Sequence, residues 1–112
     1  MPVRHRMKLT PENFELVKAG KKRLEFRLFD EKRKAFQVGE RIELAKLPEL
    51  DTSVIVEITS LDVYADLPTA YAAKAADLPE TTYADFSEHL LSFYSESEIA
   101  KYGVVAIGII LM

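Results

Sequence analysis

The last eleven residues, "YGVVAIGIILM", are the feature of this sequence that most constrains its fold. The run is too short to cross a bilayer as a helix, which takes about 20 residues. From Val104 to Leu111 the side chains are apolar at odd and even positions alike. This pattern is typical of a strand that is covered on both faces. We therefore predict a central strand over residues 104–111.

Four earlier segments alternate apolar and polar residues, as half-buried strands do. They are residues 3–9, 23–29, 41–47 and 53–65. In the second of them one face carries only large apolar side chains, namely Leu24, Phe26 and Leu28. The opposite face carries Arg23, Glu25, Arg27 and Phe29. We expect this charged row to lie on the outer, exposed side of the strand.

Helix signals separate these segments. Thr10 as N-cap, Pro11 at the first position and Gly20 as the stop predict a short helix between the first two strands. Residues 30–39 indicate a turn or short helix that ends at Gly39. The alanine-rich residues 67–77 are helix-prone.

Two more helices are expected before the last strand. Residues 83–94 place Phe86, Leu90 and Phe93 at helical spacing, so we expect all three on a buried face. Ser95 and Glu98 have the spacing of a capping box, which marks the start of a further helix.

The predicted order is strand, helix, three strands, a helical region and a strand. It indicates a β-rich α+β fold, either a small mixed sheet or a partly closed barrel with short helices at its mouth. At 112 residues, without linker or repeat, the sequence predicts one domain over residues 1–112. It has no cysteine, which excludes disulfides and thiolate metal sites and suggests the cytoplasm. We see no secretory signal and expect no membrane partner.

Charge is divided unevenly along the chain. Residues 1–46 hold 13 Lys and Arg against 7 Asp and Glu, whereas residues 47–112 hold 2 against 11. Seven of the cations lie in residues 20–34, "GKKRLEFRLFDEKRK". One interpretation is a positive face that attracts an anionic ligand; the other is that the two halves attract each other within the fold.

The corner between the first helix and the second strand concentrates this charge. Lys21 and Lys22 follow directly on Gly20, and Glu25 stands two residues from an arginine on each side. A lysine here could contact phosphate or serve as a base or nucleophile, and the arginines have donors for a ligand. The alternative is a solvated row of charges without a ligand.

Residues 7–44 resemble the N-terminal half of ASCH domains, small barrels related in fold to PUA domains. The family pattern is a strand, a helix, G-x-K-x-x-E-x-R and a later G-(D/E)-x-I turn. The first motif is matched by Gly20, Lys22, Glu25 and Arg27, and the second by "GERI" at residues 39–42. The family's Y-S-x-x-E-x-x-x-Y-G pattern before the last strand is matched by Tyr94, Ser95, Glu98, Tyr102 and Gly103.

The resemblance implies an RNA- or nucleotide-binding protein. Some small bacterial ASCH proteins are enzymes, among them an amidohydrolase of N4-acetylcytidine and a metal-dependent ribonuclease. The amidohydrolase uses a lysine in this corner, which Lys22 matches, and a threonine two positions before the arginine. Glu25 stands at the threonine position, so the resemblance supports the same pocket rather than the same deacetylation.

We hypothesise that Lys21, Lys22 and Arg23 contact phosphates, that Glu25 accepts from a base edge or holds Arg27, and that Arg27 donates in bidentate fashion. Gly20 forms part of the same site. Tyr94 and Tyr102 are the tyrosines that we favour for stacking on a base. If the chain is a hydrolase, Lys22 and Glu25 are its catalytic candidates.

No cofactor or metal is expected, because the two histidines, His5 and His89, have no partners at ligand spacing. Glu80, Asp85 and Glu88 either add a carboxylate to the site or form a solvated helix face. Three functions stay open: an RNA or nucleotide binder, a nucleotide- or RNA-directed hydrolase at the same residues, and a protein-interaction module. Nothing in the sequence indicates an oligomeric state.

Overall fold

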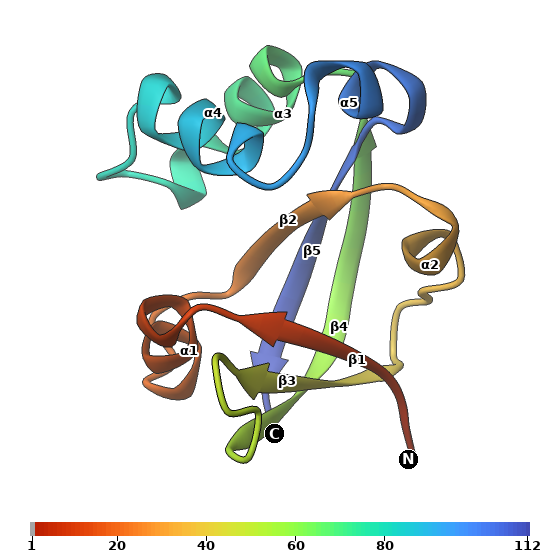
Figure 1. Cartoon of the computed structure of the whole chain (residues 1–112), viewed down its shortest axis with the longest axis vertical. Helices are drawn as coiled ribbons and strands as arrows, with labels where there is room; N and C mark the ends of the chain where they lie inside the picture. Colours follow the sequence, from red (N-terminus) through yellow and green to blue (C-terminus); the bar gives the residue numbers. More distant parts are fainter. Residues whose placement is uncertain (1) are drawn as a thin grey trace. The chain divides into compact units, whose positions relative to one another are not determined.

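The computed structural model describes residues 2–112 (Figure 1). Its elements in chain order are β1 (Val3–Leu9), α1 (Pro11–Lys18), β2 (Leu24–Leu28), α2 (Glu31–Lys34), β3 (Arg41–Lys46), β4 (Ser53–Tyr64), α3 (Leu67–Lys74), the 3₁₀ turn η1 (Ala75–Asp77), α4 (Tyr83–Leu91), α5 (Glu96–Tyr102) and β5 (Val104–Leu111). Each predicted strand and helix is present, so the α+β class is confirmed.

The strands of the described chain form one mixed sheet in the order β1-β3-β4-β5-β2. β1 runs parallel to β3, and β3 runs antiparallel to β4. β5 lies between β4 and β2, which confirms the prediction of a central strand. Its residues are buried from Val104 to Ile109, whereas Ile110 and Leu111 are exposed.

The described chain divides into two compact units, each made of several segments. The first contains the chain up to Glu25, then Phe36–Leu61 and Ile107–Met112; the second contains Phe26–Ala35 and Asp62–Ala106. β2, β4 and β5 each contribute residues to both units. That residues 1–112 act as one domain stays a prediction.

In the first unit α1 packs against β1 and β3. The apolar faces of these elements and of β4 supply the core of this unit: Met7, Leu9, Phe14, Val17, Ile42, Leu44, Val56 and Ile58 are all buried. α1 begins as predicted, because the Thr10 side chain accepts from the backbone N–H of Asn13 at 3.4 Å and Pro11 needs no acceptor.

The turn before β3 ties that strand to β1. Gly39 has φ +93° and donates its N–H to the Ile58 carbonyl at 2.8 Å. The Glu40 carboxylate accepts from the Gln37 N–H at 2.9 Å and from the His5 ring at 2.7 Å, and Arg4 lies 3.7 Å away. The His5 hydrogen bond is the main reason that the pKa of Glu40 is lowered from its ordinary value of 4.5, helped by Gln37 and the positive charge of Arg4.

This carboxylate makes stability depend on pH. A group whose pKa is lower in the folded chain stabilises it above the ordinary value, and the contribution disappears as the pH falls through the folded value. We expect Glu40→Gln to lower the free energy of unfolding at neutral pH and to have no effect in strong acid. Urea unfolding across the acid range measures this. Glu49→Gln, which changes an exposed carboxylate after β3, is the matched control for the substitution itself; an effect of Glu40→Gln that does not vary with pH contradicts the assignment.

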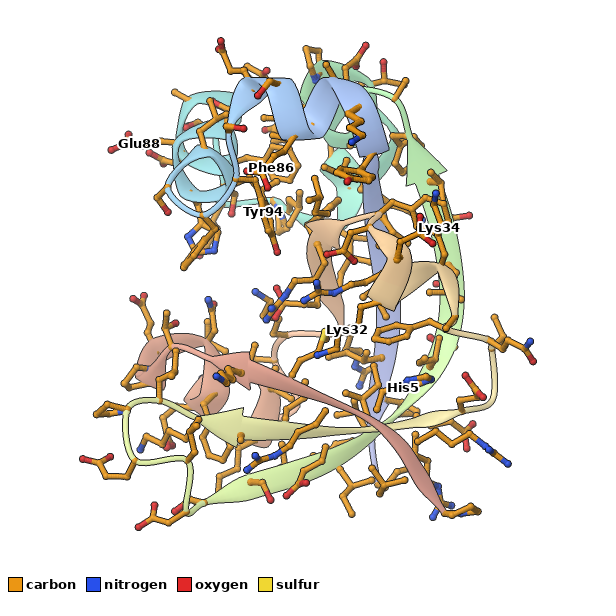
Figure 2. The ribbon with its side chains drawn as sticks, turned by 45° about the vertical axis from the view of Figure 1, so that its right-hand side comes forward. His5, Lys32, Lys34, Phe86, Glu88 and Tyr94 are labelled. Carbon is orange, nitrogen blue, oxygen red and sulfur yellow. The ribbon has the colours of Figure 1, made fainter. Side chains whose placement is uncertain are left out.

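The second unit contains the helices α3, α4 and α5, which gather near the C-terminal end of β4 (Figure 1). Phe86 of α4 packs edge-on against Phe26, with ring centroids 4.8 Å apart. The ring centroid of Tyr71 in α3 lies 5.5 Å from that of Phe86. Figure 2 shows Phe86 among these helices and Glu88 pointing outward from α4. The Tyr71 hydroxyl donates to the Thr81 carbonyl at 2.6 Å, which fixes the loop before α4.

One helix prediction is wrong in part. Phe86 and Leu90 are buried as expected, but Phe93 is 57% exposed. α4 ends at Leu91, so Phe93 lies beyond the helix and off its buried face. The capping box is confirmed: the Ser95 hydroxyl accepts from the Glu98 N–H at 3.1 Å, and the Glu98 carboxylate accepts from the Ser95 N–H at 2.9 Å.

Candidate functional site

The candidate site in the first unit is the corner, which we define as residues 20–25, from the turn after α1 to the first two residues of β2. Gly20, with φ +73°, ends the helix in a Schellman motif. Its N–H donates to the Val17 carbonyl at 2.9 Å, and the Lys21 N–H donates to the Leu16 carbonyl at 2.9 Å. The Lys22 N–H reaches the Leu16 carbonyl as well, at 3.2 Å. The backbone of Gly20, Lys21 and Lys22 is thereby turned back onto the last turn of α1. Glycine at position 20 allows this turn, and Lys22, two residues later, is held beside the helix.

The Lys22 ammonium is held between two oxygen acceptors. Its Nζ donates to Oδ1 of Asn13 at 3.2 Å and lies 3.4 Å from Oε1 of Glu25. The Lys22 side chain is only 22% exposed. The ammonium has three donors and no acceptor, so two of its hydrogens face these groups and one is left for a ligand.

Glu25 is the one charged residue that is buried among those the structure describes, with 4% of its surface exposed. The expectation that it belongs to an exposed charged row is therefore wrong for this residue. Strand alternation places Glu25 opposite Leu24 and Phe26, but it cannot tell whether other elements also cover that face. A buried carboxylate is stable only with a charged or hydrogen-bonding partner, and Lys22 supplies one.

Lys21 and Arg23 flank Lys22 and are both exposed. The Arg23 carbonyl accepts from the Ile109 N–H at 3.0 Å, which fixes the corner to the last strand. The structure thus brings Gly20, Lys21, Lys22, Arg23 and Glu25 together in one short segment of the first unit, with two cations open to solvent and one held in place.

Arg27, Tyr94 and Tyr102 belong to the second unit, and all three are half-buried. Tyr94 lies between α4 and α5, with its ring centroid 6.4 Å from that of Phe93 (Figure 2). The Tyr102 ring has the Lys101 Nζ 5.0 Å from its centroid, a cation–π contact.

The remaining polar residues considered for the site, His89 and Asp85 among them, contact neighbouring residues of the second unit. His89 is exposed, and its ring packs edge-on against Phe93 at 5.2 Å. Residues 2–112 contain no group of three or more His, Cys, Asp or Glu that could hold a metal ion. Asp85 is in the first turn of α4 behind the N-cap Thr82. Lys74 donates to Asp62 at 2.8 Å, and this hydrogen bond raises the pKa of Lys74.

Asn13 is a residue of the corner's surroundings that the sequence patterns did not single out. It lies in the first turn of α1, nine residues before Lys22. Its spacing to Lys22 matches no helical or strand period. Only the Schellman motif, which turns the chain back along α1, brings the two side chains together.

The family model of the ASCH domain matches residues 7–112, which includes the corner, the turn at Gly39 and the last helix and strand. The chain belongs to the ASCH domain family. This family is linked to RNA binding. Its motif residues have physical roles here: Gly20 ends α1, Lys22 and Glu25 pair, and Glu40 joins the turn to β1.

Solved structures agree with the ASCH assignment. The crystal structure of the hypothetical protein PH0355 is 32% identical, with a TM-score of 0.83, over 96% of this chain and 98% of that one. The solution structure of protein PF0455 from Pyrococcus furiosus is 28% identical, with a TM-score of 0.73, over 97% and 98%. The crystal structure of ASCH from Zymomonas mobilis is 16% identical, with a TM-score of 0.57, over 93% and 64%, and this match shows the fold alone.

No curated protein matches this ASCH chain. None of the helices described for residues 2–112 has the length and apolar character that a membrane span requires.

Proposed function

We propose that this ASCH protein binds single-stranded RNA or a nucleotide through the corner. The observation that carries the proposal is the position of Lys22, whose ammonium is held by Asn13 and the buried Glu25 while one of its hydrogens stays available. A preorganised donor costs less entropy on binding than a freely rotating lysine. Exposed Lys21 and Arg23 on either side would meet the phosphates.

In this proposal Glu25 acts on the ligand chiefly by holding Lys22. For the second unit we propose that Arg27 donates to the ligand and that the half-buried Tyr94 and Tyr102 offer ring faces for stacking. Such a role would place the protein in the cytoplasm, which also suits a chain without cysteine.

Salt dependence tests the phosphate contacts. For single-stranded nucleic acid, the slope of log affinity against log salt is about −0.7 for each neutralised phosphate. Contacts from Lys21 and Arg23 predict a slope of about −1.4, and Lys21→Gln should reduce its magnitude by about 0.7. Fluorescence anisotropy with a labelled decanucleotide measures the slope.

The matched control removes the same charge elsewhere in the first unit. Lys8→Gln changes an exposed lysine of β1 and should leave the slope unchanged. A flat salt response, or an equal effect of both substitutions, would exclude the corner as the phosphate-binding segment. If no RNA or nucleotide binds at all, the protein-interaction module becomes the better interpretation.

A second candidate function is hydrolysis of a nucleotide or RNA substrate. The observation in its favour is the pairing of a largely buried lysine with a buried carboxylate, since catalytic lysines and acids occupy such environments. Lys22 and Glu25 would then be the catalytic residues. The binding mixtures can be analysed by NMR for released product, including acetate from an RNA that carries one N4-acetylcytidine. Product that persists in Lys22→Ala would exclude this assignment.

A further inference from the structure

Asn13 has a fixed orientation that leaves its donors unused. The Lys22 ammonium can only donate, so the Asn13 amide must present Oδ1 to it, as the 3.2 Å contact shows. The two hydrogens on Nδ2 then point away from Lys22. Within residues 2–112, the side chain of Asn13 makes its hydrogen bond with Lys22, and its backbone N–H donates to the N-cap Thr10. The Nδ2 group therefore stays available to a ligand.

Asn13 and Lys22 together present three donor hydrogens. Nδ2 supplies two of them and Nζ supplies the third. The Lys22 ammonium already faces the Glu25 carboxylate at 3.4 Å. A donor cluster with a carboxylate this close suits a neutral acceptor better than a phosphate, which the exposed Lys21 and Arg23 serve.

We propose that Asn13 is a ligand-binding residue that, together with Lys22, receives a carbonyl oxygen of a nucleobase. This inference rests on the proposed function and adds base selectivity to it. A carbonyl oxygen of uracil has two lone pairs and can accept from Asn13 and Lys22 together. Adenine has no carbonyl oxygen: each of its ring nitrogens can accept one hydrogen bond and its exocyclic amine accepts none, so one of the two donors stays unsatisfied. The cluster therefore selects uracil over adenine.

Asn13→Asp separates this role from simple support of Lys22. The aspartate keeps an oxygen opposite Nζ, so Lys22 stays in place, but it replaces the two donors by an acceptor. A carboxylate in the first turn of α1 is also favourable to the helix, so the variant should fold. We expect the ratio of affinities for oligo-U and oligo-A decanucleotides to fall about tenfold, as for the loss of one well-placed hydrogen bond.

The experiment is a pair of anisotropy titrations at low salt, where binding is strongest. Lys18→Gln is the matched control, because it lowers the net charge by the same amount from an exposed position on the same helix; it should weaken both ligands equally and keep the ratio. An Asn13→Asp protein with the wild-type ratio overturns this inference and leaves the proposed function standing. A wild-type protein that binds neither oligonucleotide overturns both.

Discussion

Gly103→Ala is expected to lower the free energy of unfolding by about 3 kcal/mol. Gly103 follows α5 with φ +75° and ψ −177°, a region of backbone space that is essentially restricted to glycine. A Cβ at this position would stand 2.7 Å from the Tyr64 carbonyl oxygen. Because that oxygen is backbone, no change of rotamer can relieve the contact.

The backbone around Gly103 has little freedom to adjust. Its N–H donates to the Ile99 carbonyl at 2.8 Å, and its carbonyl accepts from the Phe29 N–H at 2.9 Å. A shift that relieved the clash would weaken one of these hydrogen bonds. This explains physically why glycine follows Tyr102 where the last helix gives way to the last strand.

Gly20→Ala is the matched control for Gly103→Ala. Gly20 has nearly the same φ, +73°, but nothing lies within 4 Å of an added Cβ. It should therefore lose only the conformational preference, about 1 kcal/mol. Thermal unfolding followed by circular dichroism measures both, at roughly 4 °C for each kcal/mol. If both variants lost the same free energy of unfolding, the clash between the added Cβ of residue 103 and the Tyr64 carbonyl would be relieved without a loss of stability.

Phe14→Ala is expected to cost about 3–5 kcal/mol. The Phe14 side chain is 0% exposed within the core of the first unit, and the Lys46 ammonium lies 5.6 Å from its ring centroid. Truncation would remove the buried ring and leave a cavity under α1. The same helix carries Asn13 and ends in the turn that places Lys22, so under the proposed function RNA affinity should fall together with stability.

Leu16→Ala controls for the change of helix residue. Leu16 is on the same helix but 38% exposed, so its truncation should cost about 1 kcal/mol or less. Urea unfolding of both variants gives the comparison. If Phe14→Ala lowered the free energy of unfolding no more than Leu16→Ala, the conclusion that α1 packs against β1 and β3 through Phe14 would be wrong.

Local structure could be predicted from the sequence with few errors. Thr10, Pro11 and Gly20 delimit α1 as expected, and Ser95 and Glu98 form their capping box. These signals succeed because caps and turns are decided by hydrogen bonds between residues three to five positions apart. The prediction for Phe93 failed because α4 stops at Leu91, and helical spacing alone does not reveal where a helix ends.

The candidate site could be predicted only in part. The motif identified Lys22 and Glu25, but it gave no indication that Glu25 is buried or that Asn13 faces Lys22. Both facts arise from contacts between residues that the linear pattern does not relate. Burial of Glu25 requires cover on the second face of β2, and alternation describes only which side chains share a face.

The sequence by itself determined the types and order of the strands and helices, the helix end at Gly20, and the concentration of cations at the corner, because each depends on side-chain chemistry and short-range backbone geometry. The tertiary structure alone decided that β1 pairs in parallel with β3, that Glu25 is buried beside Lys22, and that Asn13 faces Lys22. Pairing and burial depend on which distant segments come to cover a surface, and that choice is made by the packing of the whole chain.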